Sequence, residues 1–342
     1  MVLIRVPNFA IVSAVIYFEE FTTQVMDGRA IIKPLDPAKF CDPSVTADGS
    51  VRAAVALDGL DTLWINTGTL CNLTCENCYI ESSPLNDRLA YITAPEAASY
   101  LDEIEELALG TTEIGFTGGE PFMNPHIIVM LDDVLSRGHR ALVLTNAMRP
   151  MRRHEAALLD LRERFGAALT IRVSVDHYTQ DLHEAERGAN SWDRTIEGLV
   201  WLARNGFRID VAGRTQWGES EEAMRGEYAS LFGAHDIPID VADPARMVLF
   251  PEMDATVDVP EITEQCWSIL GVAPGDMMCS SSRMVVKRKG ADKPAVVACT
   301  LLPYEPAFEL GETLAEARDP IALNHPHCAK FCVLGGGTCS KG

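Results

Sequence analysis

The strongest constraint on the fold is an alternation of strand-like and helix-like segments over residues 61–250. Each pair of segments takes roughly 25–40 residues, a spacing typical of repeated βα units with parallel strands. The first expected helix begins with Thr93 and Glu96, the residue pair of a capping box. The expected strands are 62–67, 112–117, 140–145, 169–175, 207–213 and 246–250, and the expected helices lie near 94–108, 126–137, 151–165, 191–205 and 220–232.

Six such units favour an α/β fold, either an open barrel or a doubly wound sheet, and both place functional residues just after the strands. The sequence changes character on either side of these units. Residues 36–50 are rich in Pro, Asp and Ser, and after residue 252 the segments become short and rich in Gly, Pro and Cys. We therefore expect an N-terminal extension over 1–60, a βα-repeat domain over 61–250 and a small cysteine-rich domain over 251–342.

Charge and hydropathy exclude several classes of protein. The 342 residues include 29 Lys and Arg against 49 Asp and Glu, which gives a formal net charge of −20. This balance argues against nucleic acid or an anionic membrane as a partner, because clustered Lys and Arg bind phosphate groups. No apolar run is long enough to span a bilayer. The apolar run 7–17 lacks the basic start and cleavage site of a secretory signal, so the sequence predicts a cytoplasmic protein.

In a reducing cytosol, clustered cysteines usually bind metal or take part in chemistry. Three of the ten cysteines, Cys71, Cys75 and Cys78, lie within eight residues just after the first expected strand. A structural zinc site needs a fourth protein ligand, and an iron–sulfur cluster is normally held by four thiolates. Three thiolates on one tight loop therefore favour a 4Fe–4S cluster with one open iron. Zinc with a remote fourth cysteine is the alternative.

Polar groups also follow the other expected strands. The second strand runs into Gly118, Gly119 and Glu120, where glycines permit close approach of the backbone and a carboxylate can take an ammonium group. We expect all these groups to face one mouth, because parallel strands end at the same edge of a sheet. The third and fourth strands lead to Thr145, Asn146, Ser174, Asp176, His183, Arg187 and Ser191.

Three motifs in this order resemble those of the radical S-adenosylmethionine (SAM) superfamily: the CxxxCxxC loop, the GGEP turn at 118–121 and the SVD…RGxxS segment at 174–191. The resemblance covers roughly residues 62–250 and implies a partial (βα)6 TIM-like barrel over 61–250. The superfamily often has an aromatic residue where this chain has Asn77, which leaves the adenine contacts open. The resemblance implies that Cys71, Cys75 and Cys78 hold the cluster, that Gly118, Gly119 and Glu120 contact the amino group of SAM, that Ser174 and Arg187 contact its carboxylate, and that Asn146 lies near its ribose.

The resemblance also implies the chemistry. A reduced cluster passes one electron to the sulfonium of SAM and breaks its C5′–S bond, and the 5′-deoxyadenosyl radical so formed takes a hydrogen atom from a substrate. The protein orients the reactants and excludes water and competing hydrogen donors. An electron donor of the flavodoxin or ferredoxin type is expected from the family.

A second set of cysteines lies in the last part of the chain. Cys279 and Cys299 flank a predicted hairpin around Gly290. This arrangement resembles the SPASM or twitch extension found in one branch of the superfamily. The resemblance implies one auxiliary 4Fe–4S cluster, and a zinc site made from the same residues is the alternative. Its expected ligands are Cys279, Cys299, Cys328 and Cys332, with Cys339 able to replace Cys332.

Cys266 has two interpretations, a buried small hydrophobe or a catalytic hydrogen-atom donor, as in some peptide epimerases of the superfamily. Asp176, Arg214 and Gln216 follow strands and are expected near the substrate. The resemblance favours modification of a ribosomally made peptide by cross-linking, epimerisation or oxidation, although residues 1–60 are short for a leader-peptide recognition domain. The alternatives are a small-molecule dehydrogenase or epimerase in natural-product or cofactor biosynthesis, and a non-catalytic scaffold, against which the GGEP turn weighs.

Overall fold

A computed structural model describes residues 23–26, 29–252 and 254–336. The apolar run 7–17 and Cys339 lie outside the described residues. The contacts divide the chain into two compact units. The sheet unit comprises 57–252 and 278–319, and the second unit comprises the described parts of 1–56, 253–277 and 320–338.

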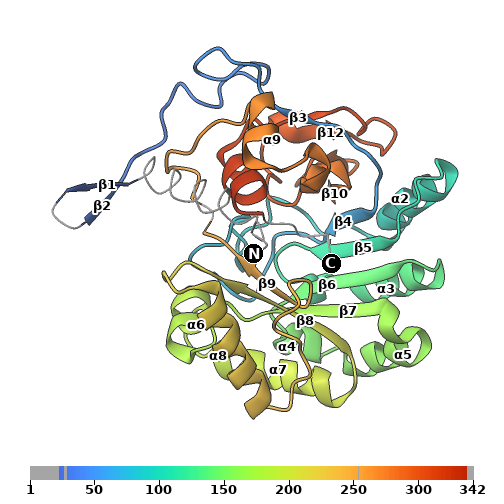
Figure 1. Ribbon diagram of the computed structural model, residues 1–342. Coiled ribbons are helices and arrows are strands. Elements are labelled where there is room, and N and C mark those ends of the chain that lie inside the picture. Colours follow the sequence, from blue (N-terminus) through green and yellow to red (C-terminus); the bar gives the residue numbers. More distant parts are fainter. Residues whose placement is uncertain (1–22, 27–28, 253, 337–342) are drawn as a thin grey trace, which may run out of the picture. The chain divides into compact units, whose positions relative to one another are not determined.

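The sheet unit is built on nine strands in the order β12-β11-β10-β4-β5-β6-β7-β8-β9 (Figure 1). Strands β10 and β4 to β9 run parallel, and β11 and β12 are antiparallel to their neighbours. All six predicted strands are confirmed in sequence order. The strands are β4 (Thr62–Asn66), β5 (Glu113–Thr117), β6 (Arg140–Thr145), β7 (Leu169–Ser174), β8 (Arg208–Arg214), β9 (Met247–Phe250), β10 (Ser282–Val286), β11 (Ala295–Val297) and β12 (Glu309–Gly311).

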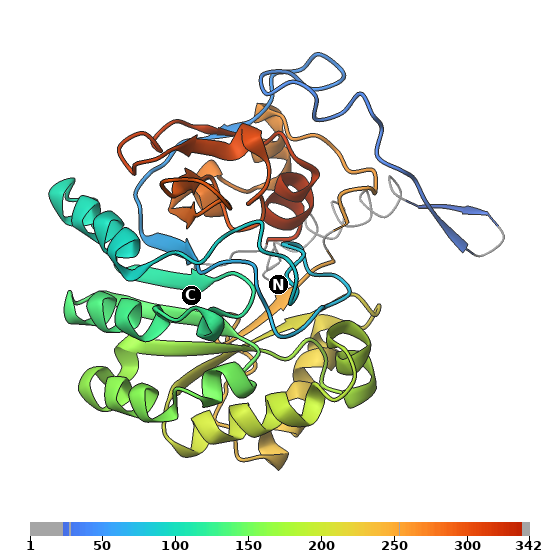
Figure 2. The ribbon, with the colours of Figure 1, turned by 180° about the vertical axis from the view of Figure 1, so that it is seen from behind.

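Helices connect the parallel strands and cover one face of the sheet (Figures 1 and 2). The capping box at the first of them is confirmed, since Thr93 N donates to Glu96 Oε2 (2.9 Å) and Glu96 N donates to Thr93 Oγ1 (3.4 Å). The helices are α2 (Ala94–Glu106), α3 (Ile127–Ser136), α4 (Arg149–Arg152), α5 (Glu155–Phe165), α6 (Gln180–Arg187), α7 (Trp192–Arg204) and α8 (Glu221–Ala234), with short turns η1 (Pro121–Met123), η2 (Gly166–Ala168), η4 (Met278–Ser280) and η5 (Pro306–Phe308).

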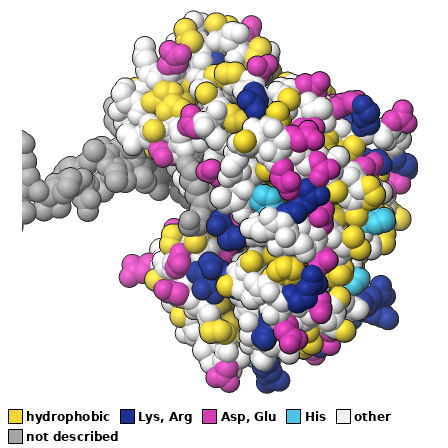
Figure 3. Space-filling model, turned by 90° about the vertical axis from the view of Figure 1, so that its right-hand side faces the viewer, with side chains coloured by type: hydrophobic (Ala, Val, Ile, Leu, Met, Phe, Trp, Pro, Cys, Tyr) yellow, Lys and Arg dark blue, Asp and Glu magenta, His cyan; other side chains and the backbone are white. Residues whose placement is uncertain are grey.

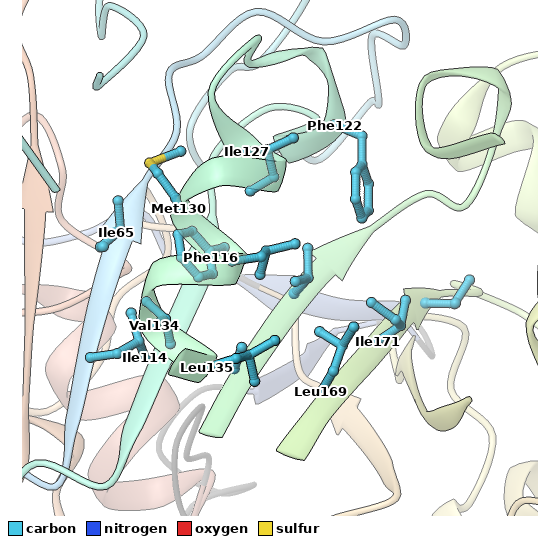
Figure 4. Close-up of a cluster of buried hydrophobic side chains, with 14 of the residues drawn as sticks. Ile65, Ile114, Phe116, Phe122, Ile127, Met130, Val134, Leu135, Leu169 and Ile171 are labelled. Carbon is cyan, nitrogen blue, oxygen red and sulfur yellow. The ribbon is translucent and has the colours of Figure 1, made fainter. Parts of the chain in front are cut away.

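The hydrophobic core of the sheet unit lies between these helices and the sheet (Figure 4). Phe116 of β5 is fully buried there beside Met130 and Val134 of α3, and Ile171 of β7 is fully buried in the same cluster. Strand β4 is buried along its whole length, as is typical of parallel strands covered on both faces. The core therefore fixes the carboxyl ends of β4 to β8, from which the polar segments extend.

Two features of this unit differ from the expectation. The sequence predicts only a polar segment where helix α6 lies, because the eight residues of this helix carry few apolar side chains from which a helical period could be recognised. The hairpin around Gly290 is present as β10 and β11, but β10 pairs with β4, with Met284 opposite Trp64. Pairing between such distant segments leaves no local pattern in the sequence. The division into three domains at residues 60 and 250 stays a prediction.

The second unit is assembled from three separate segments of the chain. A buried ion pair between Arg52 Nη2 and Glu261 Oε1 (2.5 Å) joins two of them, and Arg52 Nη1 donates to the Leu323 carbonyl of the third (3.3 Å). The elements of this unit are β1 (Thr23–Met26), β2 (Arg29–Ile32), β3 (Ala54–Val55), α9 (Glu264–Leu270), η3 (Pro274–Asp276), β13 (Ile321–Ala322) and the π-helix η6 (Cys328–Leu334).

On the face drawn in Figure 3, Asp and Glu side chains stand beside Lys and Arg side chains, and the described residues of that face form no continuous basic surface. None of the helices within the described ranges has the length and apolar character needed to cross a bilayer.

Candidate cluster and cofactor site

The three clustered cysteines lie on the loop that follows β4. Cys71 is buried and its burial raises the pKa of its thiol to about 12, while burial also raises the pKa of Cys75. Backbone N–H groups already point at two of the sulfurs, since Leu73 N lies 3.4 Å from Cys71 Sγ and Ser82 N lies 3.3 Å from Cys78 Sγ. Thiols in this environment become thiolates only with a metal or a cation beside them.

The described residues contain no group of three His, Cys, Asp or Glu side chains arranged around a single metal ion. A cubane cluster binds each cysteine at a different iron, so its ligands need not converge on one point. The donor set of three thiols, with N–H groups directed at two sulfurs, fits such a cluster.

The glycine pair after β5 packs against the backbone of the cysteine loop. Gly119 N donates to the Gly68 carbonyl (2.8 Å), and Glu120 N donates to the Leu70 carbonyl (3.2 Å). A Cβ atom at Gly119 would stand 2.3 Å from the Leu70 oxygen, and Gly118 adopts a φ of +133° that favours glycine. The pair thus positions the loop, and its expected contact with SAM stays a prediction.

Glu120 is the buried acidic group at the centre of this edge of the sheet. Its carboxylate accepts hydrogen bonds from Thr145 Oγ1 (2.8 Å), Asn146 N (2.9 Å) and Phe122 N (3.1 Å). Burial raises the pKa of Glu120 to about 7. Asn146 continues the connection, because its Nδ2 donates to Asn72 Oδ1 (3.0 Å) in the cysteine loop. The structure therefore brings Glu120, Asn146 and the loop together.

Arg187 at the end of α6 is oriented by a buried carboxylate. Its Nε donates to Asp176 Oδ2 (2.6 Å) and its Nη2 donates to Asp176 Oδ1 (3.2 Å). Burial alone would raise the pKa of Asp176, but Arg187 and Arg214 hold it below its usual value. The charge of Arg187 also lowers the pKa of Cys75, against the larger effect of burial. Ser174, half-buried at the end of β7, precedes Asp176 by two positions.

Glu186, which the sequence prediction did not include, joins Arg214 and Gln216 in holding the part of the loop next to Cys78. Glu186 accepts from both Asn77 N (3.0 Å) and Asn77 Nδ2 (2.8 Å). Arg214 Nη2 donates to the Asn77 carbonyl (3.0 Å), and Gln216 Nε2 donates to Glu186 Oε2 (3.3 Å). Asn77, which departs from the aromatic common in the superfamily, is thus a polar anchor. The sequence signals for this network were that departure and the positions of Arg214 and Gln216 after a strand.

His183 of α6 is fully buried, and neither ring nitrogen has a hydrogen-bond partner among the described residues. Burial lowers the pKa of His183 from 6.5 to about 4. Because the unfolded chain binds this proton more tightly than the folded one, acidification from pH 6.5 through pH 4 is expected to remove at most roughly 3 kcal/mol of unfolding free energy.

Urea unfolding at several pH values checks this expectation. The pH dependence below 6.5 should be shallower in His183→Leu than in the wild type. His235→Leu, at an exposed position after α8, is the matched control and should follow the wild type. Equal slopes for His183→Leu and the wild type would contradict the burial effect.

The second cysteine set is divided between the two units. Cys279 in η4 and Cys299 after β11 belong to the sheet unit, while Cys328 and Cys332 lie in η6 of the second unit. Cys266 lies in α9, where Thr263 N stands 3.4 Å from its Sγ. The roles expected for these cysteines stay predictions.

Comparison with known proteins finds a matching family profile and several proteins of similar sequence. The sequence profile of the Radical SAM superfamily matches residues 65–215. Antilisterial bacteriocin subtilosin biosynthesis protein AlbA of Bacillus subtilis is 30% identical over 143 residues, which are 42% of this chain and 30% of AlbA. Mycofactocin maturase MftC of Mycobacterium ulcerans is 28% identical over 137 residues, which are 40% of this chain and 35% of MftC. The chain thus spans about a third of the length of these curated relatives.

Among solved structures, Streptococcus suis SuiB bound to precursor peptide SuiA matches with a TM-score of 0.57 at 13% sequence identity. The match covers 77% of this chain and 66% of that chain. At this identity the similarity concerns the fold alone, and it confirms the predicted α/β partial barrel.

Proposed function

We propose that this chain, which belongs to the radical SAM superfamily, cleaves SAM reductively at a 4Fe–4S cluster held by Cys71, Cys75 and Cys78. The observation that carries the proposal is the set of three thiols on one loop, which lies against the GGEP turn and beside Arg187. Such a cluster, when bound and reduced, supplies the electron that converts SAM into methionine and a radical able to take a hydrogen atom from a substrate.

The side chains at this edge of the sheet carry the charges needed to bind the ammonium and carboxylate groups of an amino acid. Glu120 is already held by three donors, and an ammonium group beside it would favour its ionised form, which burial opposes. Arg187 uses one edge of its guanidinium on Asp176 and keeps further N–H groups for a carboxylate. We assign Glu120 to the ammonium group of SAM, and Arg187 with Ser174 to its carboxylate. Asp176 then positions Arg187.

We further propose an auxiliary cluster of the SPASM or twitch kind, held by Cys279, Cys299, Cys328 and Cys332, with Cys339 as the alternative ligand. The hairpin of β10 and β11 supports this assignment, because it carries a cysteine at each base. An unpartnered guanidinium nitrogen of Arg283, buried in β10, also fits an anionic group there.

For the substrate we propose a peptide. AlbA is named for bacteriocin biosynthesis and MftC is named as a maturase, and both are similar to this chain over about two fifths of its length. A small-molecule substrate is the alternative outcome of the test below. Cys266 is proposed as a hydrogen-atom donor in the peptide reaction.

Anaerobic reconstitution with iron and sulfide tests the proposal. We expect about eight irons per chain and formation of 5′-deoxyadenosine when dithionite and SAM are added. A short peptide encoded beside the gene should then change in mass in a SAM-dependent way. An unchanged peptide, together with neighbouring genes for sugar or carbocycle chemistry, would favour a small-molecule substrate. Absence of 5′-deoxyadenosine from fully loaded protein would contradict the proposed reaction.

A further inference from the structure

Arg283 of β10 is a buried cation without a carboxylate partner among the described residues, and its exposed fraction is 1%. Its Nε donates to the Ala317 carbonyl (2.9 Å), and its Nη1 donates to the carbonyls of Cys279 (2.6 Å) and Ser282 (2.8 Å). Its Nη2 has no hydrogen-bond partner within the described ranges. A buried guanidinium in this state lacks both a counter-charge and part of its hydrogen bonding.

Other buried arginines among the described residues have a carboxylate partner. Arg187 pairs with Asp176 at 2.6 Å, and Arg172 lies 3.6 Å from Asp210. The groups of opposite charge that act on Arg283 are instead the thiols of Cys279 and Cys299 when ionised. Arg283 lies against the first of these cysteines, since its Nη1 donates to the Cys279 carbonyl (2.6 Å) while its Nη2 stays without a partner among the described residues. An anionic group bound at Cys279 would supply the counter-charge that the described carboxylates do not.

We propose that Arg283 is the counter-cation of an anionic iron–sulfur cluster ligated by Cys279 and Cys299, and that it raises the reduction potential of that cluster. The inference rests on the auxiliary cluster of the proposed function. Thiolate-ligated clusters carry net negative charge, which increases on reduction, so a fixed cation beside them stabilises the reduced form more than the oxidised form. The N–H groups of Nη2 would serve as donors to the cluster or its thiolates.

The test uses the full chain carrying Cys71→Ala, which leaves the auxiliary cluster as the expected iron site. R283Q removes the charge but keeps N–H groups for the neighbouring carbonyls, and R283K keeps the charge. R172Q is the matched control, because Arg172 is also buried but pairs with Asp210. The midpoint potential is measured by a redox titration followed by electron paramagnetic resonance, with iron counted in each sample.

We expect a more negative midpoint potential in R283Q, and potentials close to that of the unsubstituted background in R283K and R172Q. An R283Q protein with full iron and an unchanged potential overturns the inference. If R283Q is not recovered folded, R283K decides: full iron at an unchanged potential supports the role of the charge, and loss of iron overturns it. A background protein that binds no iron refutes the auxiliary cluster itself, which is a separate failure.

Discussion

Cys71→Ala is expected to abolish 5′-deoxyadenosine formation and to lower the iron content of the reconstituted protein from about eight to about four atoms per chain. The reason is that each cysteine of the loop holds one corner of the cluster, and Cys71 is the buried one of the three. The Asn146 amide nitrogen lies 4.0 Å from the Cys71 sulfur. An alanine there leaves one corner of the cluster without its ligand, and water does not take the place of the thiolate at this buried position.

Two matched variants separate this effect from a general loss of cysteine. Cys41→Ala changes an exposed cysteine of the second unit and should keep both the iron and the product. Cys266→Ala should keep the iron and the cleavage of SAM but lose the modified peptide. If Cys71→Ala retains as much iron as the wild type and still forms 5′-deoxyadenosine, the assignment of the loop is wrong.

Gly119→Ala is expected to destabilise the protein by about 1–3 kcal/mol or more and to lower its iron content as well. The new Cβ would meet the Leu70 oxygen at 2.3 Å and the Thr69 oxygen at 2.8 Å, and both are backbone atoms that cannot rotate away. The backbone must separate, and the hydrogen bonds from Gly119 N and Glu120 N to the loop would be lost. Urea unfolding of the iron-free protein and an iron count after reconstitution measure the two effects.

Gly226→Ala in α8 is the control for this variant. A Cβ at Gly226 meets nothing within 4 Å, and the residue lies inside a helix. Alanine there should raise the unfolding free energy by roughly 0.5–1 kcal/mol, because glycine is the poorer helix former. A Gly119→Ala protein as stable as the wild type would contradict the close packing of the GGEP turn on the loop.

The sequence predicted the parts of the fold that local patterns determine. The six parallel strands follow from buried runs of apolar residues, and the start of α2 follows from Thr93 and Glu96. The expected positions of Glu120 and Arg187 followed from motifs of a family. The place of β10 beside β4 could not be predicted, because strand pairing at long separation leaves no trace in either segment alone.

The polar contacts of the site were also beyond the sequence. Glu186 is one acidic residue among many in a short polar helix, and only folding brings its carboxylate to Asn77. Arg283 is one basic residue in an apolar strand, and its lack of a carboxylate partner among the described residues becomes visible only when its neighbours are known. Burial and partner identity are tertiary properties, and they decide what such residues can do.

The pairing of β10 with β4 has a consequence for how this protein folds during its synthesis. Strand β4, which leads into the cysteine loop, has β5 on one side and receives its other neighbour only when residues 282–286 have been synthesised. Until then its backbone N–H and C=O groups on that side lack a strand, a state in which nascent chains can pair with one another. This edge of β4 is therefore completed late in synthesis, and a fragment that stops near residue 250 would keep the exposed edge permanently.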